Sequence, residues 1–241
     1  MPTALILGAG SDMAVAIARR LAERKYDLVL AGRDMELLGT LQKDLQIRNG
    51  VQVTTATFDA RNYDSHPAFY AANKADLCVC AFGYLGDQDK GMTDWTEAER
   101  ILATNYTGAV SILNVVAEDY IKRQTGTIIG ISSVAGDRGR GSNYLYGSAK
   151  AGFTAYLSGL RNRAFKTGVT VITVKPGFAA TRMTAHLTLP PALTASPEQV
   201  AAAVIKGIDG KKNTVYVKGL WKWIMLAIRM IPENVFKKMN L

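Results

Sequence analysis

The chain has little cysteine or histidine, which argues against a disulfide framework and against a metal centre. Its 241 residues include 2 cysteines and 2 histidines. Cys78 and Cys80 stand two apart in a strand-like run, where no workable bridge geometry exists, so we expect buried thiols in a reducing compartment. His66 and His186 have no partners at metal-ligand spacing. We therefore expect no metal, and both histidines on the solvated surface.

Long apolar runs, linkers and internal repeats are also missing. The apolar stretch 220–231 is far shorter than the roughly 20 residues that span a bilayer. The first strand-like run begins at Thr3 and leaves no room for a signal peptide, so we expect a cytoplasmic protein. With no linker to divide it, the sequence predicts one domain, 1–218, followed by a tail, 219–241.

Strand-like apolar runs alternate with helical patterns along the chain. The runs are 3–7, 27–31, 51–57, 76–81, 127–132, 169–174 and 214–217. This alternation implies right-handed crossovers between parallel strands and a sheet covered on both faces. The expected fold class is α/β, a single doubly wound parallel sheet of about seven strands with helices on both faces.

Four polar residues suggest chemistry on a carbonyl group. Tyr146 and Lys150 are four residues apart in a helical pattern, 144–163, so the phenol and the ammonium group share one face. We expect the cation to lower the pKa of Tyr146 toward neutrality, where a general acid works best. Ser133 ends an apolar run and would emerge at a strand's carboxyl end, where open α/β sheets bind ligands. Together with Asn105, these side chains predict proton delivery to a carbonyl, and hence an enzyme.

The segment 8–14, Gly-Ala-Gly-Ser-Asp-Met-Ala, lies between a strand-like run and the helical pattern 15–21. A strand, a glycine turn and a helix N-terminus together predict a cradle for a dinucleotide pyrophosphate. Glycines let the backbone approach the anion, and the helix dipole attracts it.

The glycine turn, the four polar residues and the segment 175–181, Lys-Pro-Gly-Phe-Ala-Ala-Thr, resemble the short-chain dehydrogenase/reductase family over residues 2 to about 218. The resemblance implies a Rossmann-type sheet, with Tyr146 as proton donor and Lys150 holding the nicotinamide ribose. Ser133 would polarise the carbonyl, and Asn105 would anchor a water relay. Pattern and resemblance together give these cofactor-binding residues: Gly8, Gly10, Ser11, Asp12, Met13, Arg33, Asp59, Ala81, Gly83, Tyr146, Lys150, Pro176, Gly177 and Thr181.

Two stretches depart from the family's commonest pattern. In the glycine loop Leu7 replaces a threonine, and Asp12 and Ala14 replace glycines. Segment 80–83, Cys-Ala-Phe-Gly, stands where most members have Asn-Asn-Ala-Gly. Asp12 either repels the pyrophosphate or turns away and caps the helix. With segments 82–88 and 136–140, these departures resemble the branch that contains the decaprenylphosphoryl keto-pentose 2-reductases.

The residues after the second strand favour NADP. Gly32 stands where an acid would accept from the ribose 2′-hydroxyl, and the next residue, Arg33, can pair with a 2′-phosphate. The alternative is that Arg33 pairs with Asp34. Asp59, after the third strand, either contacts the adenine, as the resemblance implies, or starts a turn.

The positive charge is concentrated in the tail. Of the net charge of +9, a share of +6 lies within 206–241. On a helical wheel a charged stripe, Lys218, Lys222, Arg229, Glu233 and Lys237, borders a wide apolar face, Trp221, Trp223, Ile224, Met225, Ile228 and Ile231. This pattern is typical of an interfacial helix on an anionic membrane, and the alternative is a buried subunit interface. Pro232 predicts a break in the helix at Ile231.

Segment 183–193 is apolar, and we interpret it as a mobile lid that suits an apolar substrate. Arg138 and Arg140 either receive an anionic headgroup or are solvated.

We expect NADPH-dependent reduction of an apolar or lipid-linked ketone by a homo-oligomer, dimer or tetramer, at the inner face of a membrane. The alternatives are a soluble 3-oxoacyl or general carbonyl reductase and a non-catalytic NADP-binding regulator. Nucleic acid is not expected, because the basic tail is interleaved with a continuous apolar face.

Overall fold

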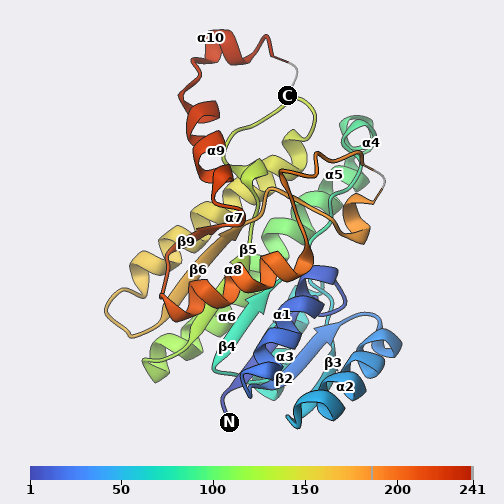
Figure 1. Cartoon of the computed structure of the whole chain (residues 1–241), viewed down its shortest axis with the longest axis vertical. Coiled ribbons are helices and arrows are strands. Elements are labelled where there is room, and N and C mark those ends of the chain that lie inside the picture. The colour runs from blue at the N-terminus through green and yellow to red at the C-terminus, as the bar shows by residue number, and fades with distance from the viewer. Residues whose placement is uncertain (186, 240–241) are drawn as a thin grey trace.

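The computed structural model describes residues 1–185 and 187–239, and its centre is a parallel sheet of seven strands (Figure 1). The strand order is β3 (Val53–Thr57), β2 (Asp27–Gly32), β1 (Thr3–Leu7), β4 (Leu77–Cys80), β5 (Thr127–Ile131), β6 (Thr170–Lys175) and β9 (Thr214–Tyr216). Each strand-like run of the sequence forms one of these strands. The predicted doubly wound α/β fold is confirmed.

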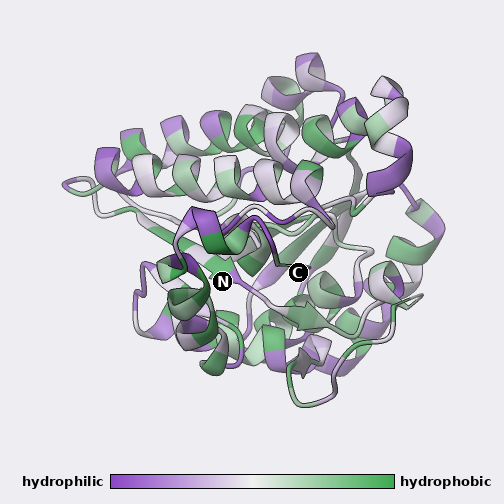
Figure 2. Cartoon of the chain, turned by 90° about the horizontal axis from the view of Figure 1, so that it is seen from above, coloured by the Kyte–Doolittle hydropathy of each residue, from purple (hydrophilic) through white to green (hydrophobic). Residues whose placement is uncertain are grey.

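Helices cover both faces of the sheet, and each face has its own apolar core. The helices α1 (Asp12–Glu23), α2 (Met35–Asn49) and α8 (Pro197–Asp209) bury one face, and α3 (His66–Ala72), α6 (Gly108–Arg123) and α7 (Tyr144–Arg163) bury the other. Figure 2 shows the apolar strands between the two helix layers. Cys78 and Cys80 lie in the second core as buried free thiols, as predicted.

Short polar side chains set the start of several helices. Ser11 Oγ accepts from the Ala14 amide at the start of α1, and Asp34 accepts from the Leu37 amide at the start of α2. At α8, Ser196 and Gln199 form a capping box. Two further helices, α4 (Gln88–Thr93) and α5 (Trp95–Leu102), lie beside the carboxyl end of the sheet (Figure 1).

The predicted lid is held at both ends by a small second sheet. Strands β7 (Phe178–Ala179) and β8 (Thr194–Ala195) pair in parallel, so the segment that joins them begins and ends at this small sheet. The sequence did not predict these two-residue strands, because so short a run carries no recognisable periodicity.

The tail forms α9 (Leu220–Met230) and α10 (Glu233–Phe236), separated where Pro232 was expected to break the helix. One face of α9 packs against the body through Trp221 and Met225. The tail rises beyond the carboxyl ends of the strands (Figure 1). In the described part of the chain, no helix combines the length and the apolar character that crossing a membrane requires.

The prediction that His66 is solvated is wrong. Its side chain is fully buried, with Nδ1 at 2.8 Å from Ser111 Oγ and Nε2 at 3.2 Å from the Asp59 carbonyl oxygen. Burial lowers the pKa of the ring, and both nitrogens have partners, so a neutral imidazole fits the core. His186 lies outside the described residues.

Candidate active site

A cleft of about 460 Å³ opens where the carboxyl ends of β1 and β4 meet. Twelve of the fourteen predicted cofactor residues line it: Gly8, Gly10, Ser11, Asp12, Met13, Arg33, Asp59, Ala81, Gly83, Tyr146, Lys150 and Thr181. Pro176 and Gly177 are not in its lining. Within the described chain, no group of three or more His, Cys, Asp or Glu side chains could hold a metal ion.

Tyr146 lies in the first turn of α7, within reach of Ser133 at the end of β5. The Ser133 hydroxyl oxygen accepts from the Ala135 amide at 3.1 Å, and the Ser133 side chain also hydrogen-bonds with Tyr146. Burial raises the pKa of Tyr146 to about 12, and the hydrogen bond with Ser133 opposes the rise only in part. The expected shift toward neutrality is therefore wrong here. The phenol stays protonated at neutral pH and can donate its proton.

Lys150 lies one turn further along α7, and its side chain is buried. Its Nζ donates to the Ile131 carbonyl oxygen at 3.1 Å and lies 5.7 Å from the centroid of the Tyr146 ring. Burial lowers the pKa of Lys150 to about 8. The amine therefore titrates close to physiological pH, beside the Tyr146 phenol.

Asn105 is held rigidly behind the cleft. It lies in a π-helix, Ala103–Thr107, a local irregularity that is frequent at functional sites. Its Nδ2 donates to the carbonyl oxygens of Tyr84 at 2.6 Å and Ile101 at 2.8 Å, and its Oδ1 accepts from the Tyr84 amide at 3.2 Å. These bonds fix the loop after β4, so Asn105 positions one wall of the cleft.

An ion pair joins Asp12 of the glycine loop to Arg182, the residue directly before the predicted lid. The Asp12 carboxylate accepts from the Arg182 amide at 2.7 Å and from Arg182 Nε at 2.9 Å, and the Arg182 guanidinium also donates to the Gly10 carbonyl oxygen. The first turn of α1 is capped by Ser11 rather than by Asp12. The aspartate is thus neutralised by an arginine 170 residues away, which neither sequence alternative had foreseen.

At the adenosine end of the cleft, Arg33 lines the wall and is exposed. Its neighbour Asp34 caps α2, accepting from the Leu37 amide at 3.0 Å, and in the described chain it forms no ion pair with Arg33. Asp59 starts a turn, because its Oδ1 accepts from the Arg61 amide at 2.9 Å. It also lines the cleft, and its contact with the adenine stays a prediction.

Gly177 meets the tail rather than the cleft. A side chain at Gly177 would lie 2.0 Å from the Trp221 indole, so only glycine leaves room for this ring. Trp221 Nε1 donates to the Leu193 carbonyl oxygen at 3.0 Å, and its ring contacts Phe178 edge-on at a centroid distance of 5.2 Å. Trp221 therefore joins the Pro-Gly segment and the end of the lid.

Sequence reasoning missed several residues of the cleft. Tyr84 and Arg100 line it, with the guanidinium carbon 4.1 Å above the centre of the phenol ring. Arg61 and Arg182 also line it. Arg182 follows Thr181 directly, and an unexplained acid at position 12 was the one signal that could have pointed to it.

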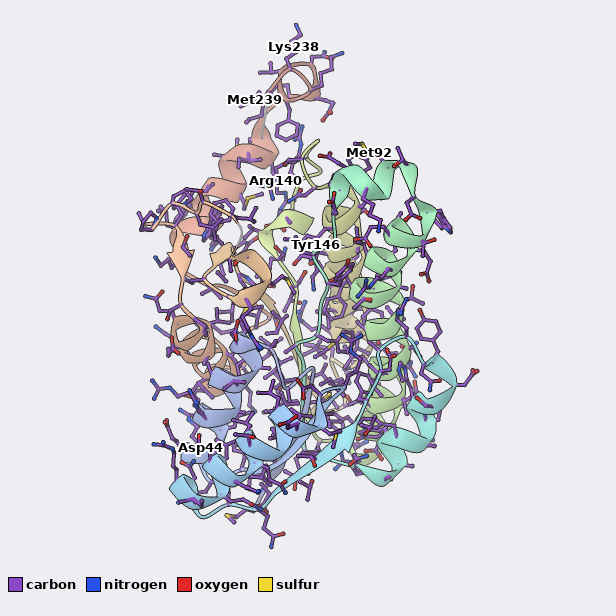
Figure 3. All side chains as sticks on the ribbon, turned by 90° about the vertical axis from the view of Figure 1, so that its right-hand side faces the viewer. Asp44, Met92, Arg140, Tyr146, Lys238 and Met239 are labelled. Atoms are coloured by element: carbon purple, nitrogen blue, oxygen red, sulfur yellow. The ribbon has the colours of Figure 1, made fainter. Side chains whose placement is uncertain are left out.

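The two arginines of the loop between Ser133 and Tyr146 differ in their surroundings. Arg138 donates to the carbonyl oxygens of Arg229 and Ile231 and to Glu233 at 2.6 Å, so it fastens the end of α9. Its guanidinium is held by the tail rather than solvated, and an anionic headgroup at Arg138 stays a prediction. Figure 3 shows Arg140 beyond Tyr146, toward the tail.

The comparisons with known proteins agree with this architecture. The model of the short chain dehydrogenase family matches residues 2–191. An uncharacterised oxidoreductase of Mycobacterium tuberculosis is 35% identical over 240 residues, which cover 98% of this chain and 96% of that protein. A ketoacyl reductase of a Nostoc species is 28% identical over 249 residues, which cover 97% of this chain and 86% of that protein.

Among solved structures, an actinorhodin polyketide ketoreductase with NADPH has a TM-score of 0.82 and 25% identity, covering 91% of this chain and 97% of that one. The strand order, the cleft and the family match agree with one another. This chain belongs to the short-chain dehydrogenase family of oxidoreductases.

Proposed function

We propose that the chain reduces a ketone with NADPH, and that the ketone is apolar or lipid-linked. The main observation in support of this reaction is the position of Tyr146 in the wall of the cleft, where it is hydrogen-bonded with Ser133 and lies close to buried Lys150. Ser133 would donate to the carbonyl oxygen and hold it against Tyr146. Tyr146 would then give its proton to that oxygen as the hydride arrives.

The cleft fits a dinucleotide. Gly8 has φ +80°, and a side chain there would lie 2.6 Å from the Phe82 backbone nitrogen, so only glycine allows this close turn before α1. NADPH supplies the hydride when bound. Arg33 would pair with the 2′-phosphate, and Lys150 would bind the nicotinamide ribose.

Two observations support an apolar substrate. A second hollow of about 530 Å³ shares Asp12, Thr181 and Arg182 with the first, and its further wall is largely apolar, with Ala185, Leu187, Leu189 and Pro191. The outward face of α9, next to the lid, exposes large apolar side chains. A hydrocarbon chain could follow this route between the reacting carbonyl and a membrane surface.

A 3-oxoacyl reductase is the second candidate. The similarity to a ketoacyl reductase favours it, since the same four catalytic residues would serve either substrate. The branch of decaprenylphosphoryl keto-pentose reductases stays a prediction, as does a homo-oligomer.

The test is a substrate screen of the purified chain with NADPH, comparing keto-sugar phospholipids with 3-oxoacyl thioesters. We expect turnover of the lipid-linked ketones and a fall in kcat of at least about 10² in Tyr146→Phe, with NADPH affinity within a few-fold. NADPH should also bind more tightly than NADH, and Arg33→Ala should remove most of the difference. Undiminished turnover in Tyr146→Phe would exclude the proposed proton donor.

A further inference from the structure

The loop that joins Ser133 to Tyr146 carries one charge that has no ion-pair partner among residues 1–185 and 187–239. Asp137 in this loop pairs with Lys175 and accepts from the Tyr216 hydroxyl at 2.9 Å, and Arg138 holds the tail. Arg140 has no ion-pair partner among the described residues. Its Nε is shut off from solvent and forms no hydrogen bond there.

The environment of Arg140 disfavours an isolated charge. Burial lowers the pKa of its guanidinium, and no carboxylate of the described residues counteracts that effect. A guanidinium does not lose its proton in proteins, so the charge persists in this half-buried position, where a partner of opposite charge would stabilise it. An anion other than those of the described residues would be such a partner.

Two further buried polar atoms near this loop lack partners. Gln88, the first residue of α4, uses its Oε1 to accept from the Leu145 amide at 3.0 Å, and its Nε2 has no partner. Asn143, whose amide donates to the Arg140 carbonyl oxygen at 3.2 Å, has an unpartnered Oδ1. Three of the four such atoms in the described chain thus belong to this loop or to a residue that touches it.

These atoms stand apart from the cofactor cleft. Neither Arg140 nor Gln88 lines it, so the phosphates of NADPH are not their partner. In Figure 3, Arg140 lies between Tyr146 and the end of the tail, where Lys238 and Met239 are labelled, with Met92 of α4 on the other side. An anion bound at Arg140 would therefore lie on the tail side of Tyr146 in this view.

We propose that Arg140, assisted by the Gln88 amide, binds an oxyanion carried by the keto substrate, a phosphoryl or carboxylate group separate from the reacting carbonyl. The inference rests on the proposed ketone reduction and adds the substrate's charge to it. Arg140 is then a specificity-determining residue. The guanidinium would pair with two oxygens of the anion, and the free Asn143 Oδ1 would accept from a hydroxyl of the same headgroup.

Anion binding can be measured without turnover. With NADP⁺ saturating, so that the cofactor's own phosphate sites are filled, hexyl phosphate binding is followed by calorimetry in the full chain and in Arg140→Gln. We expect the Kd to rise by ten-fold or more in the variant, as for the loss of a charge-assisted contact. Hexanol should bind equally weakly to both. Arg163→Gln, a change of an exposed arginine at the far end of α7, is the matched control and should leave the Kd unchanged.

Two ligands distinguish the sources of the anion. Short-chain phosphatidic acid tests a lipid headgroup, and glycerol 3-phosphate tests a soluble phosphate; binding of either that is lost in Arg140→Gln supports the subsite and identifies its class. Equal Kd values for hexyl phosphate in the full chain and Arg140→Gln would overturn it. Turnover of neutral ketones is assayed separately, so a failure of the proposed reductase activity would appear there and not in the binding data.

Discussion

At the scale of single residues, burial affects the proposed catalytic residues, Tyr146 and Lys150, as much as charge does. Tyr146 and Lys150 stand where their spacing predicts, yet their pKa values move in the directions that desolvation imposes. The sequence could place the two side chains on one helix face. It could not show how deeply the sheet and the loop after β4 would bury them, because burial depends on segments far away in the chain.

The pKa of Lys150 leads to a pH prediction. Burial lowers this pKa to about 8, whereas that of Tyr146 is about 12, so between them the phenol keeps its proton while the amine loses its charge. Reduction that depends on the charged amine should therefore decline as pH rises through about 8. The check is a profile of kcat against pH with NADPH saturating. Lys150→Arg, which cannot lose its charge, should abolish that decline in whatever activity it retains.

The pair of Asp12 and Arg182 makes a second residue-scale prediction. Arg182→Ala leaves the aspartate uncompensated beside the proposed pyrophosphate site, so NADPH should bind a few-fold more weakly, on the order of 1 kcal/mol for a partly exposed pair. Adding Asp12→Asn should restore most of the affinity, because the repulsion disappears. Fluorescence titration of NADPH measures both. No recovery in the double variant would show that Arg182 binds the cofactor directly.

At the scale of elements, periodicity predicted the strands and the break at Pro232, since both follow from local backbone constraints. Contacts between distant elements were not predictable in this way. Trp221 was assigned to one wide apolar face, but it fills the space above Gly177 and is 5% exposed. His66 is buried because Ser111 and the Asp59 carbonyl oxygen satisfy it, and neither partner is recognisable from sequence spacing.

The buried pair of Asp137 and Lys175 fixes the loop between Ser133 and Tyr146 to the sheet, with side chains 3% and 9% exposed. Asp137→Ala strands a buried ammonium group and should lower the free energy of unfolding by about 3 kcal/mol or more. Asp44→Ala, which breaks exposed pairs with Arg19 and Arg48, should cost about 1 kcal/mol or less. Urea denaturation of both variants makes the comparison. Similar decreases in the free energy of unfolding in the two variants would mean that the buried pair stabilises the protein no more than the exposed pairs do.

At the scale of the whole molecule, α9 presents two apolar faces, and only one of them is used. Trp221 and Met225 pack inward. Outward, Leu220, Trp223, Leu226 and Met230 are 56%, 63%, 46% and 75% exposed. Cations border this outer face at Lys222 and Arg229, and Glu233 is neutralised by Arg138. Four side chains form a patch far smaller than the 20 to 30 residues of a typical subunit interface, and a second copy would bring more cations to it.

The outer face of α9 is therefore expected to bind anionic lipid. The protein should sediment with vesicles that contain phosphatidylserine and be released as salt rises, because screening weakens the attraction of the cations. Trp223→Ser should reduce this binding several-fold, and Trp95→Ser, which changes an even more exposed tryptophan on α5, should not. Trp221 is unsuitable for the test, since its loss would disturb the lid. If no protein sediments at low salt, the outer face of α9 does not bind anionic lipid. If Trp223→Ser instead shifts an oligomer toward smaller species, that face binds a second subunit. Either result would remove the main support for a lipid-linked ketone over a soluble one.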